Sequence, residues 1–290
     1  LKHRINEDFQ KEQWTIIHAA ILMIYSIADE PKNDNVGLFI ASHFDTILKA
    51  TEPSQCPRLR ETALFVVGLT IKNYPQIITQ ARDSTDPRIS AIIDSIMPTI
   101  HVDGEQQHNF TYDIKQVYIR YASIIYHLSS AWRNYQYESH LSQFWDNLYE
   151  IASSLFNIGI NADEHLLITN SSEALNQLII NSSPDVLNKL DWLFDRTLVM
   201  LDESKTFFSS SDILYVVQSL LCSNVSSLLL KLKRSSRGGI DIIQNYAHRT
   251  LNSLFKLLSN KHTLIYEEGL MAISALVSAT NRDQMSIQVF

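Results

Sequence analysis

Apolar residues recur along the chain every three or four positions, in segments separated by short polar stretches. This spacing predicts amphipathic α-helices, each of which turns one apolar stripe toward a neighbour. The pattern gives about six antiparallel helix pairs, in which an outer helix precedes an inner one. The predicted pairs are residues 1–8 with 12–30, 36–50 with 57–74, 86–99 with 111–130, 137–157 with 162–182, 184–203 with 207–232, and 238–259 with 264–280.

Proline and glycine mark several of the predicted boundaries. Pro87 and Pro184 suit the first turns of two outer helices, where the missing amide hydrogen would have no intrahelical partner. Gly238 and Gly239 are predicted to separate the fifth pair from the sixth. The polar segment 101–111 is predicted to be a long surface loop, and both a tolerated insertion and a functional loop are open interpretations of it.

The inner helices resemble one another in sequence. The segments around Ala20 and Ala63 share a pattern of small and apolar residues, and these alanines are 43 positions apart. A third copy covers residues 266–276. This period is typical of HEAT and armadillo repeats, which are about 40–47 residues long. Because one pair of helices cannot bury both of its apolar faces, successive pairs must stack. We therefore predict an all-α fold, a right-handed α-solenoid with outer helices on the convex side and inner helices lining a concave surface.

Composition agrees with this fold. The 290 residues include only 7 glycines and 7 prolines, whereas sheets and their turns use these residues freely. No uninterrupted apolar run approaches the roughly 20 residues of a membrane-spanning helix, so we expect no membrane insertion. The formal charge of −7 argues against direct nucleic-acid binding, which needs a basic surface, and favours basic partner segments. We expect residues 1–290 to be a single solenoid segment of a longer protein, because the last predicted unit is unfinished.

The sequence holds no recognisable catalytic or metal-binding signature. It has no Gly-x-Ser-x-Gly nucleophile motif, no phosphate-binding glycine loop, and no His-x-x-x-His or Cys-x-x-Cys spacing. We therefore expect a protein that is not an enzyme and that uses no cofactor or metal ion. A helical enzyme stays open as an alternative.

Three inner-helix blocks resemble the importin-beta family of karyopherins, which are nuclear import receptors. The run from Trp14 to Ile24, closed by Ala28 to Pro31, is similar to the family's Trp, Ala-Ala-Val-Met-Ala-Phe-Gly and acidic-Gly-Pro pattern. The block from Arg60 to Gly68 resembles Arg-Asp-Thr-Ala-Ala-Trp-Thr-Val-Gly. The block from Ile265 to Leu276 is close to Glu-Asp-Ala-Leu-Met-Ala-Val-Ser-Thr-Leu. Their order and separation suit the family's central HEAT repeats.

The resemblance implies a segment of a nuclear transport receptor. Such a receptor binds cargo or the adaptor importin-alpha on an acidic concave face, and Phe-Gly nucleoporins between its convex helices. The GTPase Ran releases the cargo. The receptor works in the cytoplasm, in the nucleus, and at the nuclear envelope and pore. A HEAT-repeat scaffold for a multiprotein complex, without a transport role, is the alternative.

The resemblance also indicates where a partner would bind. Family members stack inner-face tryptophans on basic and aliphatic side chains of the adaptor. The first of these positions corresponds to Phe65, whose ring can hold a cation less well than Trp, and the next falls near Ser123, which cannot stack. Whether Tyr121 or Tyr126 faces the groove stays open.

Six residues are therefore candidate protein-binding residues: Phe65, Glu61, Asp29, Glu30, Glu267 and Glu268. Core packing is the competing interpretation for an aromatic residue at helical spacing. Acids early in a helix, such as Glu61, also complement the helix dipole.

Other conspicuous side chains have structural interpretations. Core packing is favoured for Trp132, Trp145 and Trp192. Arg60 is expected to join a polar ladder between repeats, with a neighbouring carboxylate as its partner.

Overall fold

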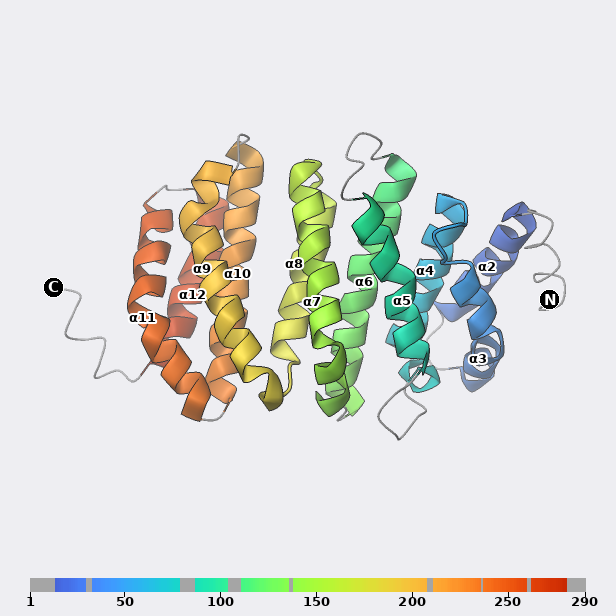
Figure 1. The fold of residues 1–290 in the computed structure, drawn as a ribbon, viewed down its shortest axis with the longest axis horizontal. Coiled ribbons are helices and arrows are strands. Elements are labelled where there is room, and N and C mark those ends of the chain that lie inside the picture. Colours follow the sequence, from blue (N-terminus) through green and yellow to red (C-terminus); the bar gives the residue numbers. More distant parts are fainter. Residues whose placement is uncertain are drawn as a thin grey trace. The chain divides into compact units, whose positions relative to one another are not determined.

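The computed structural model of the chain describes residues 14–29, 33–78, 87–103, 111–135, 138–207, 211–235, 237–259 and 262–280. All regular elements among these residues are helices (Figure 1). The α-helices are α2 (Trp14–Ala28), α3 (Asp34–Lys49), α4 (Pro57–Asn73), α5 (Pro87–Asp103), α6 (Tyr112–Tyr135), α7 (Glu138–Asn161), α8 (His165–Ile180), α9 (Leu187–Phe207), α10 (Ser211–Arg234), α11 (Arg237–Leu258) and α12 (Thr263–Ala279). Two short 3-10 turns, η1 (Pro75–Ile77) and η2 (Pro184–Val186), follow α4 and precede α9. Every predicted helix from residue 12 onward is confirmed, and the predicted helix at 1–8 lies outside the described residues.

Two predicted boundaries are wrong by a few residues. Helix α5 continues to Asp103, so no loop begins at residue 101, and positions 104–110 of that predicted loop lie outside the described residues. Gly238 and Gly239 lie in the first turn of α11 instead of between helices. A Cβ added at Gly239 would lie 2.2 Å from the carbonyl oxygen of Leu232 in α10. Glycine at this position therefore permits a close approach of two backbones.

The chain forms two compact units. One comprises Leu1–His140 with Phe144–Ala174, and the other comprises Leu141–Gln143 with Leu175–Phe290. In the first unit, α4 packs against α2, α3 and α6. In the second unit, α10 packs against α9, α11 and α12, and α11 also packs against α9 and α12. Within each unit, successive helix pairs therefore stack on one another, as the repeat predicts.

Polar contacts follow the repeat period in both units. His18 Nε2 lies 2.9 Å from Thr62 Oγ1, and these residues are 44 positions apart. Ser219 Oγ donates to the carbonyl oxygen of Leu264 at 3.2 Å, across 45 positions. Equivalent positions of α2 and α4, and of α10 and α12, thus lie side by side, which agrees with the period seen in the sequence.

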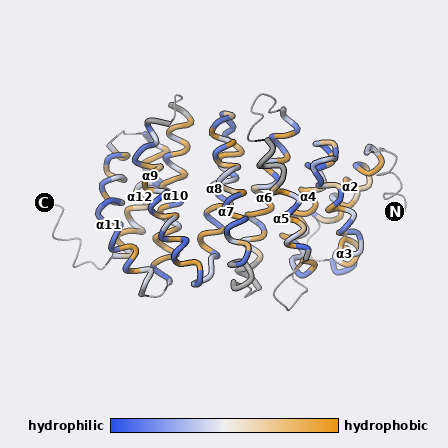
Figure 2. The backbone as a smooth tube through the Cα atoms, in the orientation of Figure 1, coloured by the Kyte–Doolittle hydropathy of each residue, from blue (hydrophilic) through white to orange (hydrophobic). Residues whose placement is uncertain are grey.

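Helix α4 shows how small and branched residues build the core of the first unit. Leu59, Ala63, Val66 and Val67 of α4 are fully or almost fully buried, and Ala20 of α2 is 7% exposed. The small residues let neighbouring helices approach, and each buried branched side chain contributes about 1.5–3 kcal/mol relative to exposure. Figure 2 shows hydrophobic and hydrophilic residues interspersed along the helices, as a one-sided apolar stripe requires.

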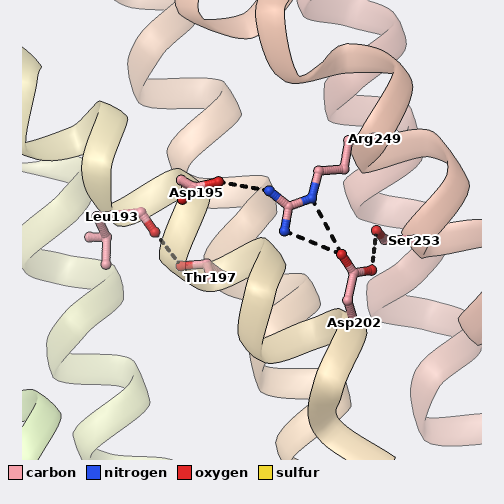
Figure 3. Close-up of polar contacts among 6 residues, drawn as sticks. All are labelled: Leu193, Asp195, Thr197, Asp202, Arg249 and Ser253. Atoms are coloured by element: carbon pink, nitrogen blue, oxygen red, sulfur yellow. Dashed lines mark hydrogen bonds and ion pairs between the residues drawn. The ribbon is translucent and has the colours of Figure 1, made fainter.

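In the second unit, α9 and α11 are joined by a polar network around Arg249 (Figure 3). Arg249 Nη1 donates to Asp195 Oδ1 at 2.7 Å, and its Nε and Nη2 both lie 3.3 Å from Asp202 Oδ2. The other oxygen of Asp202 accepts a hydrogen bond of 2.5 Å from Ser253 Oγ. Arg249 therefore donates three hydrogen bonds to two carboxylates of α9, and Asp202 accepts three hydrogen bonds from two residues of α11.

Helix α10 qualifies the expectation about membranes. Its residues Ile213–Arg234 are long enough and, at a mean hydropathy of 1.7, apolar enough to cross a membrane. Polar residues such as Ser223 interrupt its apolar run, so no uninterrupted stretch reaches the length of a membrane-spanning helix. About 61% of this segment is buried among the other helices. A buried core helix can have the same length and apolar composition as a membrane-spanning one.

Candidate protein-binding surface

Phe65 lies between side chains of the two helices that flank α4. On one side, its ring centroid is 5.0 Å from that of Tyr25 in α2, with the planes tilted by 37°. On the other side, the guanidinium carbon of Arg120 in α6 lies 3.9 Å from the Phe65 centroid. This is well within the roughly 6 Å over which a cation is attracted to an aromatic face. Phe65 is half-buried, so it is neither a core residue nor a freely exposed one.

Glu61 lies one helical turn before Phe65 and holds the same arginine. Arg120 Nη2 donates to Glu61 Oε1 at 2.8 Å, and Arg120 Nε donates to the same oxygen at 3.0 Å. The two side chains are 25% and 27% exposed, so the pair is only partly screened by solvent. Helix α4 has no acidic residue in its first turn, so Glu61 lies beyond the reach of the helix dipole. The structural reason for an acidic residue at position 61 is therefore its ion pair with Arg120 and not the helix dipole.

Arg60 points the other way, into the contact between α4 and α6. Its Nη2 donates to the hydroxyl oxygen of Tyr121 at 2.6 Å, and the two residues are 7% and 0% exposed. Arg60 therefore makes a polar contact between repeats, as expected, but the partner shown is the Tyr121 hydroxyl and not the carboxylate that the sequence predicted. The adjacent carboxylate, Glu61, pairs with Arg120. Tyr121 belongs to the core and not to the exposed surface, whereas Ser123 and Tyr126 are half-buried.

His127 adds a titratable group near the same helix pair. Burial, and to a lesser extent the ammonium of Lys72, lower the pKa of His127 to about 4. Its ring makes an edge-on contact with Tyr126, with centroids 5.3 Å apart. The imidazole is therefore neutral near pH 7, and it contributes no positive charge to the surface.

The remaining acidic candidates divide between the two units. Asp29 is exposed directly after the last residue of α2, where its amide donates to the carbonyl oxygen of Tyr25 at 3.3 Å. Glu30 lies outside the described residues. Glu267 is exposed on α12, and α12 has no acidic residue in its first turn, so the dipole does not account for Glu267 or Glu268. Arg120 thus contacts both Glu61 and Phe65, while Asp29 in the first unit and Glu267 in the second are each exposed.

Glu268 has a more structural environment than Glu267. It is half-buried on α12, and within the described part of the chain its Oε2 has no hydrogen-bond partner. Burial, with a smaller contribution from the Glu268 carboxylate, raises the pKa of the Cys222 thiol in α10 to about 12. Glu268 therefore faces the contact between α10 and α12 with at least one oxygen.

The tryptophans do not share one role. Trp145 is 2% exposed and stacks on Tyr149 with centroids 5.3 Å apart, which confirms core packing. Trp192 is 49% exposed, and the Arg196 guanidinium lies 5.6 Å from its ring, so the prediction of core packing is wrong for this residue. The side chain of Trp132 lies outside the described residues.

Sequence reasoning missed two members of the Phe65 cluster, Tyr25 and Arg120. Tyr25 lies on α2 and Arg120 on α6, the helices on either side of α4 in the repeat, and Arg120 is 59 positions after Glu61. Arg120 carries a positive charge on the second helix of the repeat that follows the one with Glu61. That opposite charge is the signal that could have indicated the pair. The sequence does not state which residue of α6 lies opposite Glu61.

Among the described residues, no group of three or more His, Cys, Asp or Glu side chains could hold a metal ion. The arrangement around Phe65 instead combines an aromatic face, a carboxylate and a guanidinium that contacts both of them.

Structural comparison identifies the fold. No protein-family model and no curated protein matches the sequence. Two solved structures match over 95% of this chain with a TM-score of 0.72 and 16% sequence identity: a crystal structure of importin beta and the Kap95:Nup1 complex. A crystal structure of a Kap121p mutant matches over 99% of the chain with a TM-score of 0.50 and 13% identity.

These neighbours are karyopherin transport receptors. The chain has their fold, a HEAT-type α-solenoid. It spans 30% of the length of the importin beta and Kap95 chains. At this level of identity the likeness concerns the fold, and the neighbours are receptors and not enzymes.

Proposed function

We propose that the chain is a segment of a nuclear transport receptor that binds protein partners along its stacked inner helices. The observation that carries the proposal is the match to importin beta and Kap95 over 95% of the chain with a TM-score of 0.72. The Kap95 structure is a complex with Nup1, which supports a nucleoporin as one class of partner. In this proposal the protein moves between cytoplasm and nucleus through the pore.

The proposed inner surface recognises a basic segment, in a cargo or in the adaptor importin-alpha. Asp29, Glu61, Phe65, Glu267 and Glu268 are the described residues that we assign to it, and Glu30 continues it in sequence. A net charge of −7 favours the approach of a basic segment. Phe-Gly nucleoporins bind the outer helices in this proposal, and the GTPase Ran displaces the cargo.

A binding experiment tests the proposal directly. The 290-residue chain is immobilised and offered four purified partners: Ran loaded with GTP, a Phe-Gly repeat fragment, importin-alpha, and a Lys/Arg-rich peptide. We expect retention of the Phe-Gly fragment and of at least one basic partner. Retention of none would favour a scaffold without a transport role.

Salt dependence tests the acidic surface separately. Exposed charges are screened beyond about 8–10 Å near physiological ionic strength. The affinity for the basic peptide should therefore fall as the NaCl concentration rises from 50 to 500 mM (about a tenfold range). Equal affinity at both concentrations would contradict an electrostatic contribution.

A further inference from the structure

Arg120 contacts both the Phe65 ring and the Glu61 carboxylate, the two groups to which a basic residue of a partner would bind. Its guanidinium carbon is 3.9 Å from the Phe65 ring centroid. The same guanidinium donates two hydrogen bonds to Glu61, at 2.8 and 3.0 Å. An aromatic face and a carboxylate one turn apart make a site for an Arg or Lys side chain, and in this chain the occupant comes from the neighbouring repeat.

We infer that Arg120 is an internal competitor that sets how tightly the Phe65–Glu61 site binds a basic partner residue. The inference rests on the proposed function, because it specifies how one part of the proposed inner surface selects its ligand. A partner's Lys or Arg reaches the ring and the carboxylate only when Arg120 leaves them. Arg120 therefore lowers the affinity for basic segments and determines specificity.

The geometry explains why arginine can fill this role. A guanidinium is planar, so it can stack on a ring with its face while its edge donates to a carboxylate. The Phe65 ring also contacts Tyr25 of α2, with ring centroids 5.0 Å apart, so it has a support that does not depend on Arg120. Removal of the guanidinium should therefore expose a ring that stays in place.

The Phe65–Glu61 site is also exposed enough for a partner's side chain to take the place of Arg120. Arg120 and Glu61 are 25% and 27% exposed, which places the pair at the surface and not in the core. Loss of the arginine leaves the Glu61 carboxylate in contact with solvent, where a second cation can replace the first. A fully buried pair would not permit this, because an unpaired buried charge is strongly unfavourable.

The test compares Arg120→Ala with Arg58→Ala in the 290-residue chain, using a fluorescein-labelled Lys/Arg-rich peptide at low salt. Arg58 lies on α4, is 67% exposed, and pairs with Asp113 across 3.4 Å. Both variants remove one positive charge from a pair between α4 and α6, but only Arg120→Ala opens the Phe65 ring. We expect Arg120→Ala to bind the peptide about 3- to 10-fold more tightly than wild type. Arg58→Ala should change the affinity by less than about twofold.

Double variants decide whether the gain uses the site. The increase in affinity should be lost in Phe65→Leu/Arg120→Ala and in Glu61→Gln/Arg120→Ala. If Arg120→Ala lowers the helical circular dichroism signal, Arg120→Gln is used in its place, because it keeps more of the side chain's bulk. Arg120→Gln should also bind the peptide more tightly than wild type. The inference is overturned if neither Arg120 variant binds more tightly than Arg58→Ala, or if the gain survives Phe65→Leu. Retention of Ran and of the Phe-Gly fragment is measured on the same samples, so failure of the proposed function would be recognised independently.

Discussion

Gly159 in α7 lies against the backbone of Ile168 in α8, so closely that the two helices leave no room for a methyl group. A Cβ added at Gly159 would be 2.9 Å from Ile168 Cγ1 and 3.0 Å from the Ile168 backbone nitrogen. A backbone atom cannot rotate away as a side chain can. Gly159 is therefore required by helix packing and not by a special backbone conformation.

Alanine should destabilise the protein at Gly159 but not at Gly68. Gly159→Ala forces α7 and α8 apart, and we expect it to lower the free energy of unfolding by about 1–3 kcal/mol. A Cβ at Gly68 in α4 would meet only His127 Cδ2 at 3.7 Å and Ile124 Cγ1 at 3.8 Å, which are ordinary contacts. Because alanine favours a helix interior by about 0.5–1 kcal/mol over glycine, Gly68→Ala should be neutral or stabilising. Urea unfolding followed by circular dichroism measures both, and equal losses would contradict the packing argument.

Asp202 should matter more than Asp195 for the contact between α9 and α11. Asp202 accepts hydrogen bonds from Arg249 and from Ser253, which is 6% exposed, while Asp195 is 49% exposed and contacts Arg249 through one oxygen. We expect Asp202→Ala to cost about 1–2 kcal/mol of unfolding free energy, because it leaves a buried hydroxyl without its acceptor. Asp195→Ala should cost less than about 0.5 kcal/mol, since its charge is screened by water. Thermal unfolding of the two variants at 50 and 500 mM NaCl (about a tenfold range) measures the loss of unfolding free energy in each. Equal losses would contradict the larger role assigned to Asp202.

The two cysteines should differ sharply in reactivity. Cys222 is buried on α10, and burial raises its thiol pKa from 9.0 to about 12, whereas Cys56 is half-buried before α4. The thiolate is the reactive form, so a thiol reagent at pH 8 should label Cys56 and leave Cys222 unmodified in the folded chain. Both should react in guanidinium chloride. Fast labelling of Cys222 in a Cys56→Ser variant without denaturant would contradict this assignment.

The raised pKa of Cys222 also predicts a contribution to stability that is lost at alkaline pH. Because the folded thiol has the higher pKa, the stabilisation is present below pH 9, the unfolded value, and is lost as the pH rises toward 12. Cys222→Ala removes this titration and should flatten the loss of unfolding free energy above pH 9.

His127 should make the chain sensitive to mild acid. Its pKa is lowered from 6.5 to about 4, chiefly by burial and also by Lys72. A group with a depressed folded pKa stabilises the protein above its unfolded pKa, so this contribution is lost as the pH falls from 6.5 to about 4. The loss amounts to at most about 3 kcal/mol. Unfolding of His127→Gln should be less dependent on pH in this window than that of wild type.

The sequence by itself determined the helices and their pairing in order. The apolar stripe recurs with the period of a helix, and a repeat of similar inner helices leaves each pair with a face that only the next pair can cover. The small residues at Ala20 and Ala63 therefore indicated both the period and the contact between α2 and α4. The sequence did not determine every boundary, because Gly239 permits a close approach to Leu232 that no local pattern reveals.

Only the tertiary structure decided what the candidate residues contact. The sequence indicated that Phe65 and Glu61 belong to an inner helix, but their partner is 59 positions from Glu61 and depends on the register in which α6 packs on α4. Register is set by how side chains of two helices interdigitate, and a shift of one turn would place a different residue over the ring. For the same reason Trp145 and Trp192, which look alike in sequence, became a buried and an exposed side chain. Helical periodicity is a local property of the chain, whereas the occupant of an aromatic face is a property of the packed pair.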